Sequence, residues 1–437
     1  MVTTPVQSWG RVGSWPHHLA PLPHGGGKVL PALEGRTGLA FGMGRSYGDV
    51  CLNPEGLLWL TRGMDRLIHW DEAAGRLTCE AGVLLRDIQR LMVPRGWMLP
   101  VTPGTQLVTV GGAIANDVHG KNHHRFGSFG DQLISLELLR TNGTRLRCSR
   151  DEHRELFLAT LGGLGLTGVV LEATLHLRRV EGPWVDAEDL PFKGLDAFFE
   201  LADASEAGWE HTVAWIDCLS GADVRGIFSR GNMSPEPADA GARGQRRRSM
   251  PVTPPVSLVN RLSLKAFNTA YYALGNRRAG RRRVPFEPFF YPLDSIEHWN
   301  RMYGPAGFYQ YQCVLPRAAG RQGVAELLAE IARAGQGTFL AVQDLWRPAT
   351  VRPAELSAAG RDAGAGFSGA GRRHARAVRA ARPRGDGRGR DAVPGEGRPH
   401  AARDVRAGLP RVAVVPGAAR PGHRFGVRAQ DDGTLTE

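Results

Sequence analysis

Residues 119–124, His-Gly-Lys-Asn-His-His, contain the clearest candidates for chemistry in this sequence. An imidazole accepts and donates protons near neutral pH, and a lysine ammonium donates hydrogen bonds to oxygen. His119 and His123 also have the i, i+4 spacing of zinc ligands on a helix. Because Gly120 interrupts that pair and no carboxylate accompanies it, we expect no metal site.

Two segments rich in small residues are suited to hold an anionic, flat ligand. Residues 41–49, Phe-Gly-Met-Gly-Arg-Ser-Tyr-Gly-Asp, place three glycines and an arginine in one loop. Successive N–H groups there are able to converge on an anion such as a pyrophosphate. The second segment runs from Pro103 to Asn122 and is followed by Gly-Ser-Phe-Gly at 127–130. Either segment alone is typical of tight turns, but the two together favour a ligand site.

A third glycine-rich stretch, residues 163–168, matches the pattern G-x-G-x-x-G. That motif indicates dinucleotide binding only where it follows a strand and opens a helix. Here a helix expected at 151–161 precedes it and a strand expected at 169–177 follows it, so we exclude an NAD fingerprint. The sequence also lacks the phosphate-binding pattern G-x-x-x-x-G-K-[ST].

The elements that must position these loops are helices and strands in alternation. A strand is expected at 76–81 and a helix at 83–93, ended by Pro94 and Gly96. Asn142-Gly143 separates two strand-like runs, 133–140 and 144–148, and predicts a β-hairpin. The fold class is therefore α+β, and aromatic-rich segments from about residue 181 mark a second domain.

Composition and charge indicate a globular protein and argue against a membrane-spanning or secreted one. With 42% hydrophobic and 22% charged residues in 437, the chain is long enough and apolar enough for two or three globular domains. No apolar run is long enough to span a membrane and the amino terminus lacks a secretory pattern, so we expect the cytoplasm. Five scattered cysteines predict reduced thiols. Of the net charge of +12, residues 351–437 contribute 17 arginines against 9 acidic groups, and the preceding part is nearly neutral.

An insertion at residues 235–284 carries three consecutive arginines near each end, at 246–248 and 281–283, around an apolar stretch at 256–274. A solvated surface loop is one interpretation. The other is a lid that touches an anionic lipid or the inner membrane surface, because clustered arginines attract phosphate and the apolar part can enter the interface.

These motifs, in this order, resemble the FAD-linked oxidases of the vanillyl-alcohol oxidase (PCMH) fold. The resemblance rests on GMGRSYGD at 42–49, PVTPGTQLVTVGGAIANDVHGKNHH at 100–124, GSFGD at 127–131, LGGLGLTG at 161–168 and WNRMYGPAGFYQYQCVLP at 299–316. It runs from about Trp9 to Val342. It implies a two-part, PCMH-type FAD-binding domain at 1–180 and a substrate domain with an antiparallel sheet at 181–342.

The resemblance also implies which residues bind FAD. These are Ala40, Phe41, Gly42, Met43, Gly44, Arg45, Ser46, Tyr47, Gly48, Asp49 and Val50 in the first loop, and Gly104, Thr109, Val110, Gly111, Gly112, Asn116, Asp117, Val118, His119 and Val170 elsewhere. Many members of the fold attach the flavin covalently to a histidine in the first loop. Arg45 occupies that position here, so we expect non-covalent FAD.

Within the fold, the resemblance is strongest to the branch that oxidises the 2′-hydroxyl of a polyprenylphosphoryl-β-D-ribose to a ketone. It implies that His119 orients or deprotonates the hydroxyl, that Lys121 donates a hydrogen bond to it, and that Tyr47 lines the same face. Gln310 and Gln312 alternate with tyrosines, so on a strand both amides point one way, which suits sugar hydroxyls. A solvated strand face is the other interpretation of the two glutamines.

Other functions remain open on the sequence alone. One is an oxidase of alditols or aldonolactones with the same fold. Another is a non-catalytic product whose basic tail binds nucleic acid or membrane, although for the oxidase we expect no nucleic acid partner. The resemblance also implies a partner, a short-chain reductase that would act on the 2′-keto product.

Residues 343–437 depart from the family and are rich in Arg, Ala, Gly and Pro. Such a composition does not build a packed core, so we expect a disordered or aberrant carboxyl-terminal tail. Reading one base later permits family-like segments at three places, 343–348, 362–367 and 417–428, which indicates a shifted reading frame. The lysines and the flavin-contacting tyrosine of the family's carboxyl terminus then have no counterpart, and impaired FAD binding or activity is expected.

Overall fold

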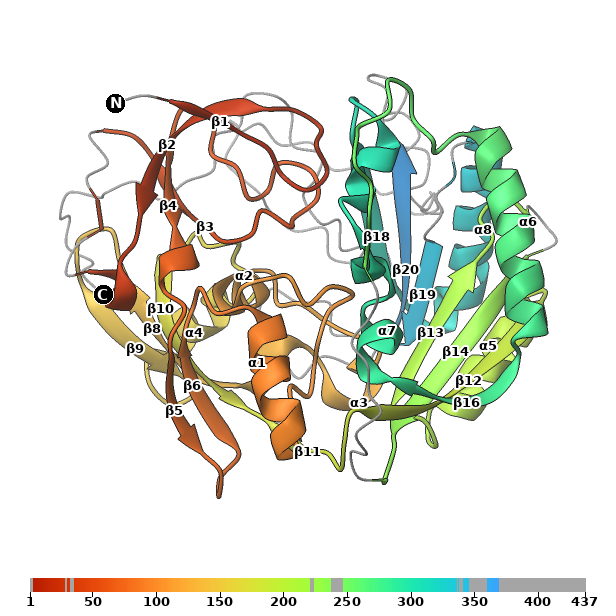
Figure 1. Cartoon of the computed structure of the whole chain (residues 1–437), viewed down its shortest axis with the longest axis horizontal. Helices are drawn as coiled ribbons and strands as arrows, with labels where there is room; N and C mark the ends of the chain where they lie inside the picture. The colour runs from red at the N-terminus through yellow and green to blue at the C-terminus, as the bar shows by residue number, and fades with distance from the viewer. Residues whose placement is uncertain are drawn as a thin grey trace, which may run out of the picture.

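The computed structural model describes residues 3–27, 30–31, 35–220, 224–236, 247–335, 337, 341–345 and 360–368. Helices and strands are mixed throughout this part, and most strand pairs are antiparallel, so the predicted α+β class is confirmed. Figure 1 shows the earlier residues, coloured red to yellow, on one side and the later residues, green to blue, on the other.

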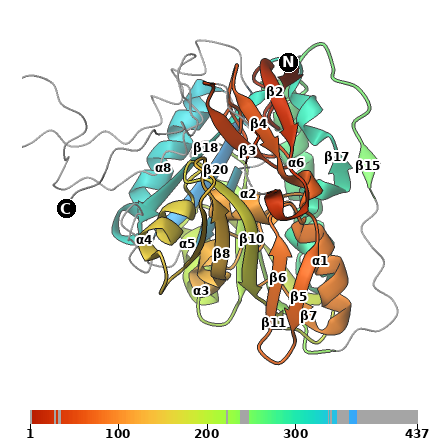
Figure 2. The same ribbon diagram turned by 90° about the vertical axis from the view of Figure 1, so that its left-hand side faces the viewer.

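Within the described residues, the first half contains two larger sheets, besides the two-stranded pairing of β7 (Trp97–Met98) with β11 (Arg178–Arg179). A four-stranded sheet has the order β1-β2-β4-β3 and a five-stranded antiparallel sheet has the order β5-β6-β10-β8-β9. Figure 2 shows the four-stranded sheet above the larger one. Their strands are β1 Thr4–Val6, β2 Trp15–Pro21, β3 Gly38–Phe41, β4 Leu57–Leu60, β5 Leu67–Asp71, β6 Arg76–Glu80, β8 Leu133–Leu139, β9 Arg145–Ser149 and β10 Val169–His176.

Local sequence signals predicted much of this half. The expected strand at 76–81 is β6, and the expected helix at 83–93 is α1, Leu85–Met92, which buries Leu85, Ile88 and Met92 on one face. The predicted hairpin is β8 and β9. Its turn requires Gly143, which has a φ of +84° that residues with a Cβ rarely adopt.

The second half is built on a seven-stranded sheet, counted over the described residues, in the order β16-β12-β14-β13-β19-β20-β18. Its neighbouring strands pair antiparallel where their register is given. The strands are β12 Trp184–Lys193, β13 His211–Ile216, β14 Arg225–Met233, β16 Gly280–Pro285, β18 Phe308–Pro316, β19 Ala341–Leu345 and β20 Gly360–Ser368.

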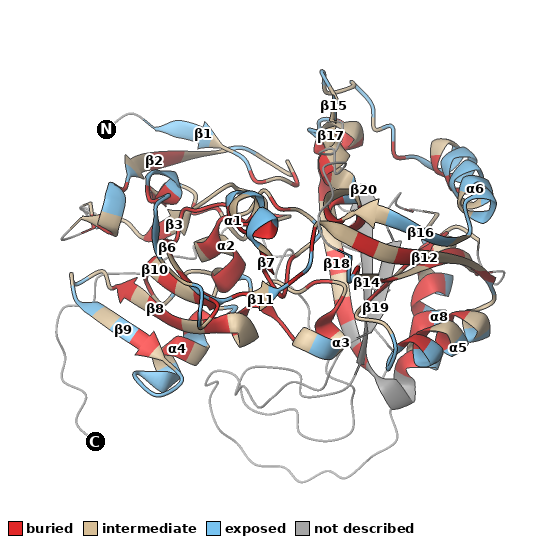
Figure 3. Cartoon of the chain, turned by 60° about the horizontal axis from the view of Figure 1, so that its bottom comes forward, coloured by how far each residue is buried: buried red, intermediate tan, exposed pale blue. Residues whose placement is uncertain are grey.

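Helices cover both faces of this sheet. Phe228 of β14 packs against Phe198 of α5, Leu195–Ser205, in the same core as α8, Arg317–Ala334. The preceding residue, Ile227, points to the opposite face and contacts Gly275 of α6, Arg261–Arg277. Figure 3 shows α6 on one side of the sheet and α5 with α8 on the other.

The remaining elements connect the two halves or support loops. They are α2 Val110–Ala115, α3 His123–Phe126, α4 Arg154–Thr160, α7 Phe286–Phe290, η1 His24–Gly26, η2 Thr61–Gly63, η3 Val93–Arg95, η4 Phe129–Gln132, η5 Pro292–Ser295, η6 Trp299–Tyr303 and the short strands β7 Trp97–Met98, β11 Arg178–Arg179, β15 Arg248–Ser249 and β17 Ile296–Glu297. None of the described helices is both long enough and apolar enough to cross a bilayer. All five cysteines are free thiols, four of them buried.

Part of the segment expected to be a disordered tail has a defined place. The backbone of β20 pairs with β18 along its whole length and with β19 on its other side. The backbone of residues 360–368 thus has a place in the sheet, and the expected disordered or aberrant tail stays a prediction. The other residues after 345 lie outside the described part.

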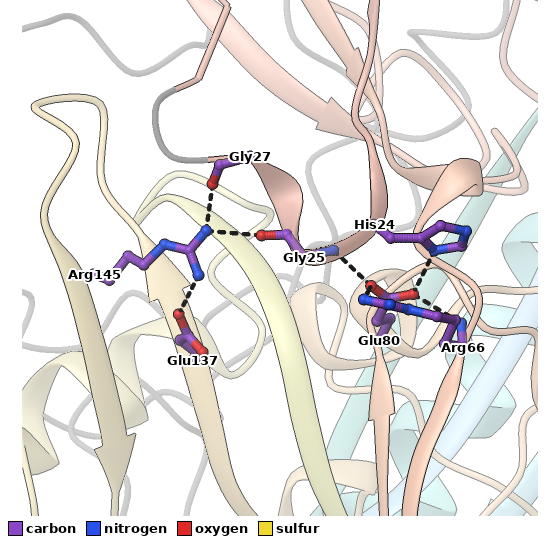
Figure 4. A network of polar contacts seen from close by, with 7 residues as sticks. All are labelled: His24, Gly25, Gly27, Arg66, Glu80, Glu137 and Arg145. Carbon is purple, nitrogen blue, oxygen red and sulfur yellow. Dashed lines mark hydrogen bonds and ion pairs between the residues drawn. The ribbon is translucent and has the colours of Figure 1, made fainter.

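A buried carboxylate joins η1 to the five-stranded sheet. Glu80, at the end of β6, accepts hydrogen bonds from the Gly25 amide at 2.6 Å, His24 Nδ1 at 3.0 Å, and the Arg66 amide and guanidinium at 2.8 and 2.9 Å (Figure 4). Arg145 supports the same loop through the carbonyls of Gly25 and Gly27. Burial alone would raise the pKa of Glu80, but these donors outweigh it and lower the pKa to about 2.

Replacing Glu80 with glutamine is expected to lower the free energy of unfolding by about 2–3 kcal/mol, because the Arg66 guanidinium loses its buried ionic partner. In the wild type, the stabilisation from Glu80 is present above about pH 4.5 and is lost as the pH falls toward 2. Denaturant titration at several pH values measures both effects. Glu72→Gln is the matched control, because its contact with Arg179 is exposed and is expected to contribute under about 1 kcal/mol. Equal losses of unfolding free energy in the two variants would contradict the stabilising role assigned to the Glu80 carboxylate.

Candidate active site

The first glycine-rich loop leaves β3 and packs directly against the start of α2. A Cβ added to Gly42 would lie 2.5 Å from Thr109 Oγ1, so only glycine permits this approach. Thr109 caps α2, since its hydroxyl accepts a hydrogen bond from the Gly112 amide at 3.0 Å. Two segments that are about 60 residues apart in sequence, and that were both predicted to bind a ligand, therefore meet here.

The backbone of this loop offers hydrogen-bond donors. The amides of Gly42, Met43, Gly44 and Arg45 donate to no other group in the described part of the protein. Gly44 has a φ of +59°, a left-handed conformation that helps to turn successive N–H groups toward one point. Such a row of amides fits an anionic diphosphate.

Other predicted cofactor residues form the support beneath the loops. Val110 and Val170 are buried in the core of the first half, and Ala40 and Val118 pack against that core. The amides of Val110 and Gly111 already donate to the carbonyls of Val83 and Ala81 at 2.8 Å. Among these amides, those left to bind an anion are therefore in the first loop. Its remaining predicted residues, Met43, Ser46, Gly48, Asp49 and Val50, are partly buried except for buried Gly48.

The loop that carries the histidine run lies against the segment at residues 100–104. Asn122 donates a hydrogen bond to the Pro100 carbonyl at 2.8 Å, and a Cβ on Gly120 would lie 2.4 Å from the Thr102 carbonyl oxygen. Gly104, in contrast, has no atom within 4 Å of the position of a Cβ. The backbone at Gly104 thus borders open space, as a flat ligand requires.

The predicted motif at 161–168 braces the far end of α2. The Gly162 amide donates to the Ile114 carbonyl at 3.0 Å and the Leu164 amide to the Ala115 carbonyl at 2.8 Å. Asp117 has a φ of +40°, and its carboxylate accepts a hydrogen bond from the Gly130 amide at 2.8 Å. Asn116 is exposed and its amide donates to the Gly112 carbonyl. These bonds fix the backbone that leads to His119.

His119 meets the second half of the protein at β18. Its Nε2 lies 2.8 Å from Nε2 of Gln312, and Gln310 Nε2 donates to Gln312 Oε1 at 3.3 Å. Because that bond turns the Gln312 oxygen toward Gln310, the Gln312 NH₂ group faces the imidazole, and His119 Nε2 accepts. The alternation of Gln310 and Gln312 along a strand therefore places both amides on one side, where Gln312 contacts His119 and Gln310 contacts Gln312.

Removal from water lowers the pKa of His119 to about 4. The Asp117 carboxylate opposes this shift but does not cancel it. The imidazole is therefore neutral at physiological pH, the form that accepts a proton.

Lys121 lies at the contact between the two halves. Its ammonium donates a hydrogen bond to the Phe289 carbonyl of α7 and lies 4.7 Å from the centroid of that ring. The Lys121 carbonyl accepts a hydrogen bond from the Thr212 amide of β13 at 2.8 Å. The structure thus places Lys121 beside the second half, and its predicted bond to a substrate hydroxyl stays a prediction.

Tyr47, the third predicted catalytic residue, belongs to an aromatic cluster. Its ring centroid lies 5.1 Å from that of Phe308 and 6.3 Å from that of Trp299. Burial raises the pKa of Tyr47, so its phenol stays protonated. Arg45 stacks on Trp9 at 3.8 Å. The ring of Tyr47 therefore positions the first loop against β18.

The sequence did not single out two further residues that hold the site together. Asp294 of η5 is buried and accepts hydrogen bonds from Thr105 Oγ1 at 2.7 Å and the Gln106 amide at 3.0 Å. Burial raises the pKa of Asp294, while the nearby Arg45 guanidinium opposes that shift. The Tyr291 hydroxyl bonds to Thr102 Oγ1 at 2.6 Å. No local signal distinguished Asp294 from Glu287 and Glu297 in the same segment, 284–303.

The geometry fits FAD, with free backbone amides for its diphosphate, glycine backbone beside open space for its ring, and a neutral histidine between the halves. A family model for the FAD binding domain matches residues 32–149. The chain is 35% identical over 338 residues to decaprenylphosphoryl-β-D-ribose oxidase of Mycolicibacterium smegmatis, covering 73% of this chain and 72% of that one.

Shorter matches are to lactone oxidases. L-gulonolactone oxidase of Mus musculus is 31% identical over 135 residues, which cover 31% of this chain and 30% of the relative. D-arabinono-1,4-lactone oxidase of Eremothecium gossypii is 26% identical over 147 residues, covering 33% and 27%. The site and these relatives together show that the chain belongs to the FAD-dependent oxidoreductases of the decaprenylphosphoryl-β-D-ribose oxidase family.

Proposed function

We propose that this oxidase converts the 2′-hydroxyl of a polyprenylphosphoryl-β-D-ribose to a ketone, on a PCMH-type fold with non-covalent FAD. The observation that carries the proposal is the row Gln310–Gln312–His119, which joins amides suited to sugar hydroxyls to a neutral imidazole beside the FAD loops. Support for the substrate comes from the relative named for that substrate, with which the chain shares most of its length.

Each group has a role that follows from its surroundings. Bound FAD supplies the hydride acceptor. His119, uncharged, accepts the hydroxyl proton as the C–H bond breaks. Gln310 and Gln312 orient the sugar, and Lys121 donates a hydrogen bond once substrate displaces its contact with Phe289. Tyr47 holds the first loop in place.

Anaerobic mixing with candidate substrates tests the proposal. A short-chain polyprenylphosphoryl-β-D-ribose is expected to bleach the flavin absorbance at least 100-fold faster than L-gulono-1,4-lactone or an alditol at equal concentration, since only the ribose places a 2′-hydroxyl under the glutamine pair. The arabinose epimer of the same lipid is the matched control for ring geometry. Faster bleaching by a lactone would favour the second candidate, a lactone oxidase, which the shorter matches support.

We also infer that the sequence after about Val342 is read in a shifted frame. The abrupt change to arginine, alanine, glycine and proline supports this, as does an alternating strand in the other frame at 362–367, where β20 lies. A frame-restored chain is expected to bind FAD more tightly than this one. Sequencing the gene checks the inference, and a gene without the family-like segments in any frame would contradict it. A short-chain reductase acting on the ketone remains a proposed partner.

A further inference from the structure

The second half of the protein holds Lys121 at both its backbone and its ammonium. The Lys121 carbonyl accepts a hydrogen bond from the Thr212 amide of β13 at 2.8 Å, and the ammonium donates one to the Phe289 carbonyl of α7. His211 directly precedes Thr212 in β13. The ring of His211 packs edge-on against Phe289 and Phe290, with centroids 6.0 and 4.8 Å away. His211 therefore joins the strand that holds the Lys121 backbone to the helix that holds its ammonium.

A buried cluster of charged groups fixes the ring of His211. Glu210 Oε1 lies 2.7 Å from His211 Nε2 and 2.7 Å from Arg178 Nη2. The side chains of His211, Glu210 and Arg178 are exposed by only 3%, 15% and 16%. Arg178 comes from β11, and its guanidinium lies 5.1 Å from the centroid of the Phe126 ring. Burial alone would raise the pKa of Glu210, but His211 and Arg178 outweigh it and lower the pKa to about 2, so the carboxylate stays ionised.

The carboxylate decides which nitrogen of His211 carries a proton. Because an ionised carboxylate only accepts hydrogen bonds, the nitrogen that faces Glu210, Nε2, carries the proton. Burial lowers the pKa of His211 although Glu210 opposes this shift, so the ring is neutral at physiological pH and Nδ1 is unprotonated. Nδ1 is buried and bonds to no group in the described part of the protein. Since no hydrogen-bonded path runs from Lys121 through His211, the arrangement favours a role in positioning over a proton relay.

The choice of a histidine here is informative, because a phenylalanine ring would also pack on α7. A phenylalanine ring has a broad preference about its last side-chain bond, whereas the contact of Nε2 with Glu210 fixes the orientation of the imidazole. Buried ion pairs are a weak source of stability, and their best-supported use is to specify one arrangement of the elements they join. In this protein those elements are β13 and α7, the two that hold Lys121.

We propose that His211, its ring fixed by Glu210, is a positioning residue that holds the Lys121 side chain in place at the active site. Glu210 acts through His211, and Arg178 balances the charge of Glu210. Without this hold, the ammonium of Lys121 samples other rotamers, and fewer molecules present it to the substrate. The use of Lys121 toward a substrate hydroxyl rests on the proposed function, whereas the hold on its side chain does not.

Chemical labelling of the lysines tests the hold without any substrate. The sequence contains four lysines, at positions 28, 121, 193 and 265, and reductive methylation with isotope-labelled formaldehyde lets NMR follow each of them. Lys193 and Lys265 are exposed and serve as internal references, and Lys121→Met identifies the remaining signal. Lys121 of the FAD-bound wild type is expected to react about tenfold more slowly than the references. In His211→Phe that protection is expected to fall by about fivefold.

A double-mutant cycle tests whether His211 acts through Lys121. His211→Phe is expected to slow flavin bleaching by a short-chain polyprenylphosphoryl-β-D-ribose by about tenfold, and Lys121→Met by about 100-fold. The double variant should match Lys121→Met within about twofold, because no ammonium is left to position. A histidine with a structural role alone would instead make the two losses multiply.

The matched control is His18→Phe, since His18 is another buried histidine but lies in β2 of the first half, and both readouts should match the wild type. His211→Phe keeps a ring against α7 and leaves Glu210 paired with Arg178, so its thermal melt should also match. If that melt is lower, the double variant decides, because a loss through unfolding would add to the loss from Lys121→Met.

Either of two results overturns the proposal: Lys121 is labelled at the wild-type rate in His211→Phe, or the two losses of rate multiply in the double variant. If the polyprenylphosphoryl-β-D-ribose does not bleach the wild-type flavin, the proposed function fails. The labelling rates then decide the hold on Lys121 by themselves.

Discussion

Replacing His119 with alanine is expected to leave FAD bound while slowing flavin bleaching by substrate by about 10²–10⁴-fold, the usual contribution of a positioned general base. The side chain contacts Gln312 rather than the backbone of the first loop, so its loss leaves the diphosphate donors in place. Stopped-flow absorbance under anaerobic conditions measures the rate. His124→Ala is the matched control, because that imidazole belongs to the same run but bonds to the Trp209 carbonyl. An unchanged rate in His119→Ala would remove His119 from the mechanism.

The pH profile supplies a second readout of the same residue. Because the pKa of His119 is lowered to about 4, the imidazole stays neutral through pH 5, and the bleaching rate should fall only as the pH drops toward 4. A solvated histidine would instead give an acid limb near its ordinary value of 6.5. In His119→Ala that limb is expected to disappear.

Replacing Gly42 with alanine is expected to weaken FAD binding by about 30-fold, or ~2 kcal/mol. The added Cβ would lie 2.5 Å from Thr109 Oγ1, so either the first loop or the cap of α2 must move, and the row of free amides loses its geometry. Titration of flavin-free protein with FAD, followed by fluorescence quenching, measures the dissociation constant. Gly208→Ala is the control, because its Cβ would meet open space. Equal affinities in the two variants would show that the first loop does not bind the diphosphate.

Local sequence signals predicted the elements whose causes are local. Asn142-Gly143 predicted the hairpin because its turn needs a left-handed residue, and the apolar spacing of 83–93 predicted α1. The alternation around Gln310 and Gln312 placed both amides on one face of β18. The family resemblance predicted that the two glycine-rich loops lie together around one FAD. The close approach of Gly42 to Thr109 agrees with that prediction.

The remaining features depend on contacts distant in sequence. Asp294 and Tyr291 bond to residues 189 positions earlier, and no local pattern encodes such a contact. The apolar stretch at 256–274 predicted an amphipathic segment, but it could not show which side of the helix packs on the sheet. The composition of residues 360–368 did not indicate β20, because the place of this strand depends on the two strands beside it.

The most direct test of the account is the flavin carried by the purified chain. Acid precipitation of the protein, followed by chromatography of the supernatant, identifies the nucleotide and its amount. The account predicts that FAD bound to the wild type is released to the supernatant, with none left in the pellet, and that Gly42→Ala releases less. A chain that binds no FAD even when titrated with it, or a flavin that stays with the pellet, would contradict it.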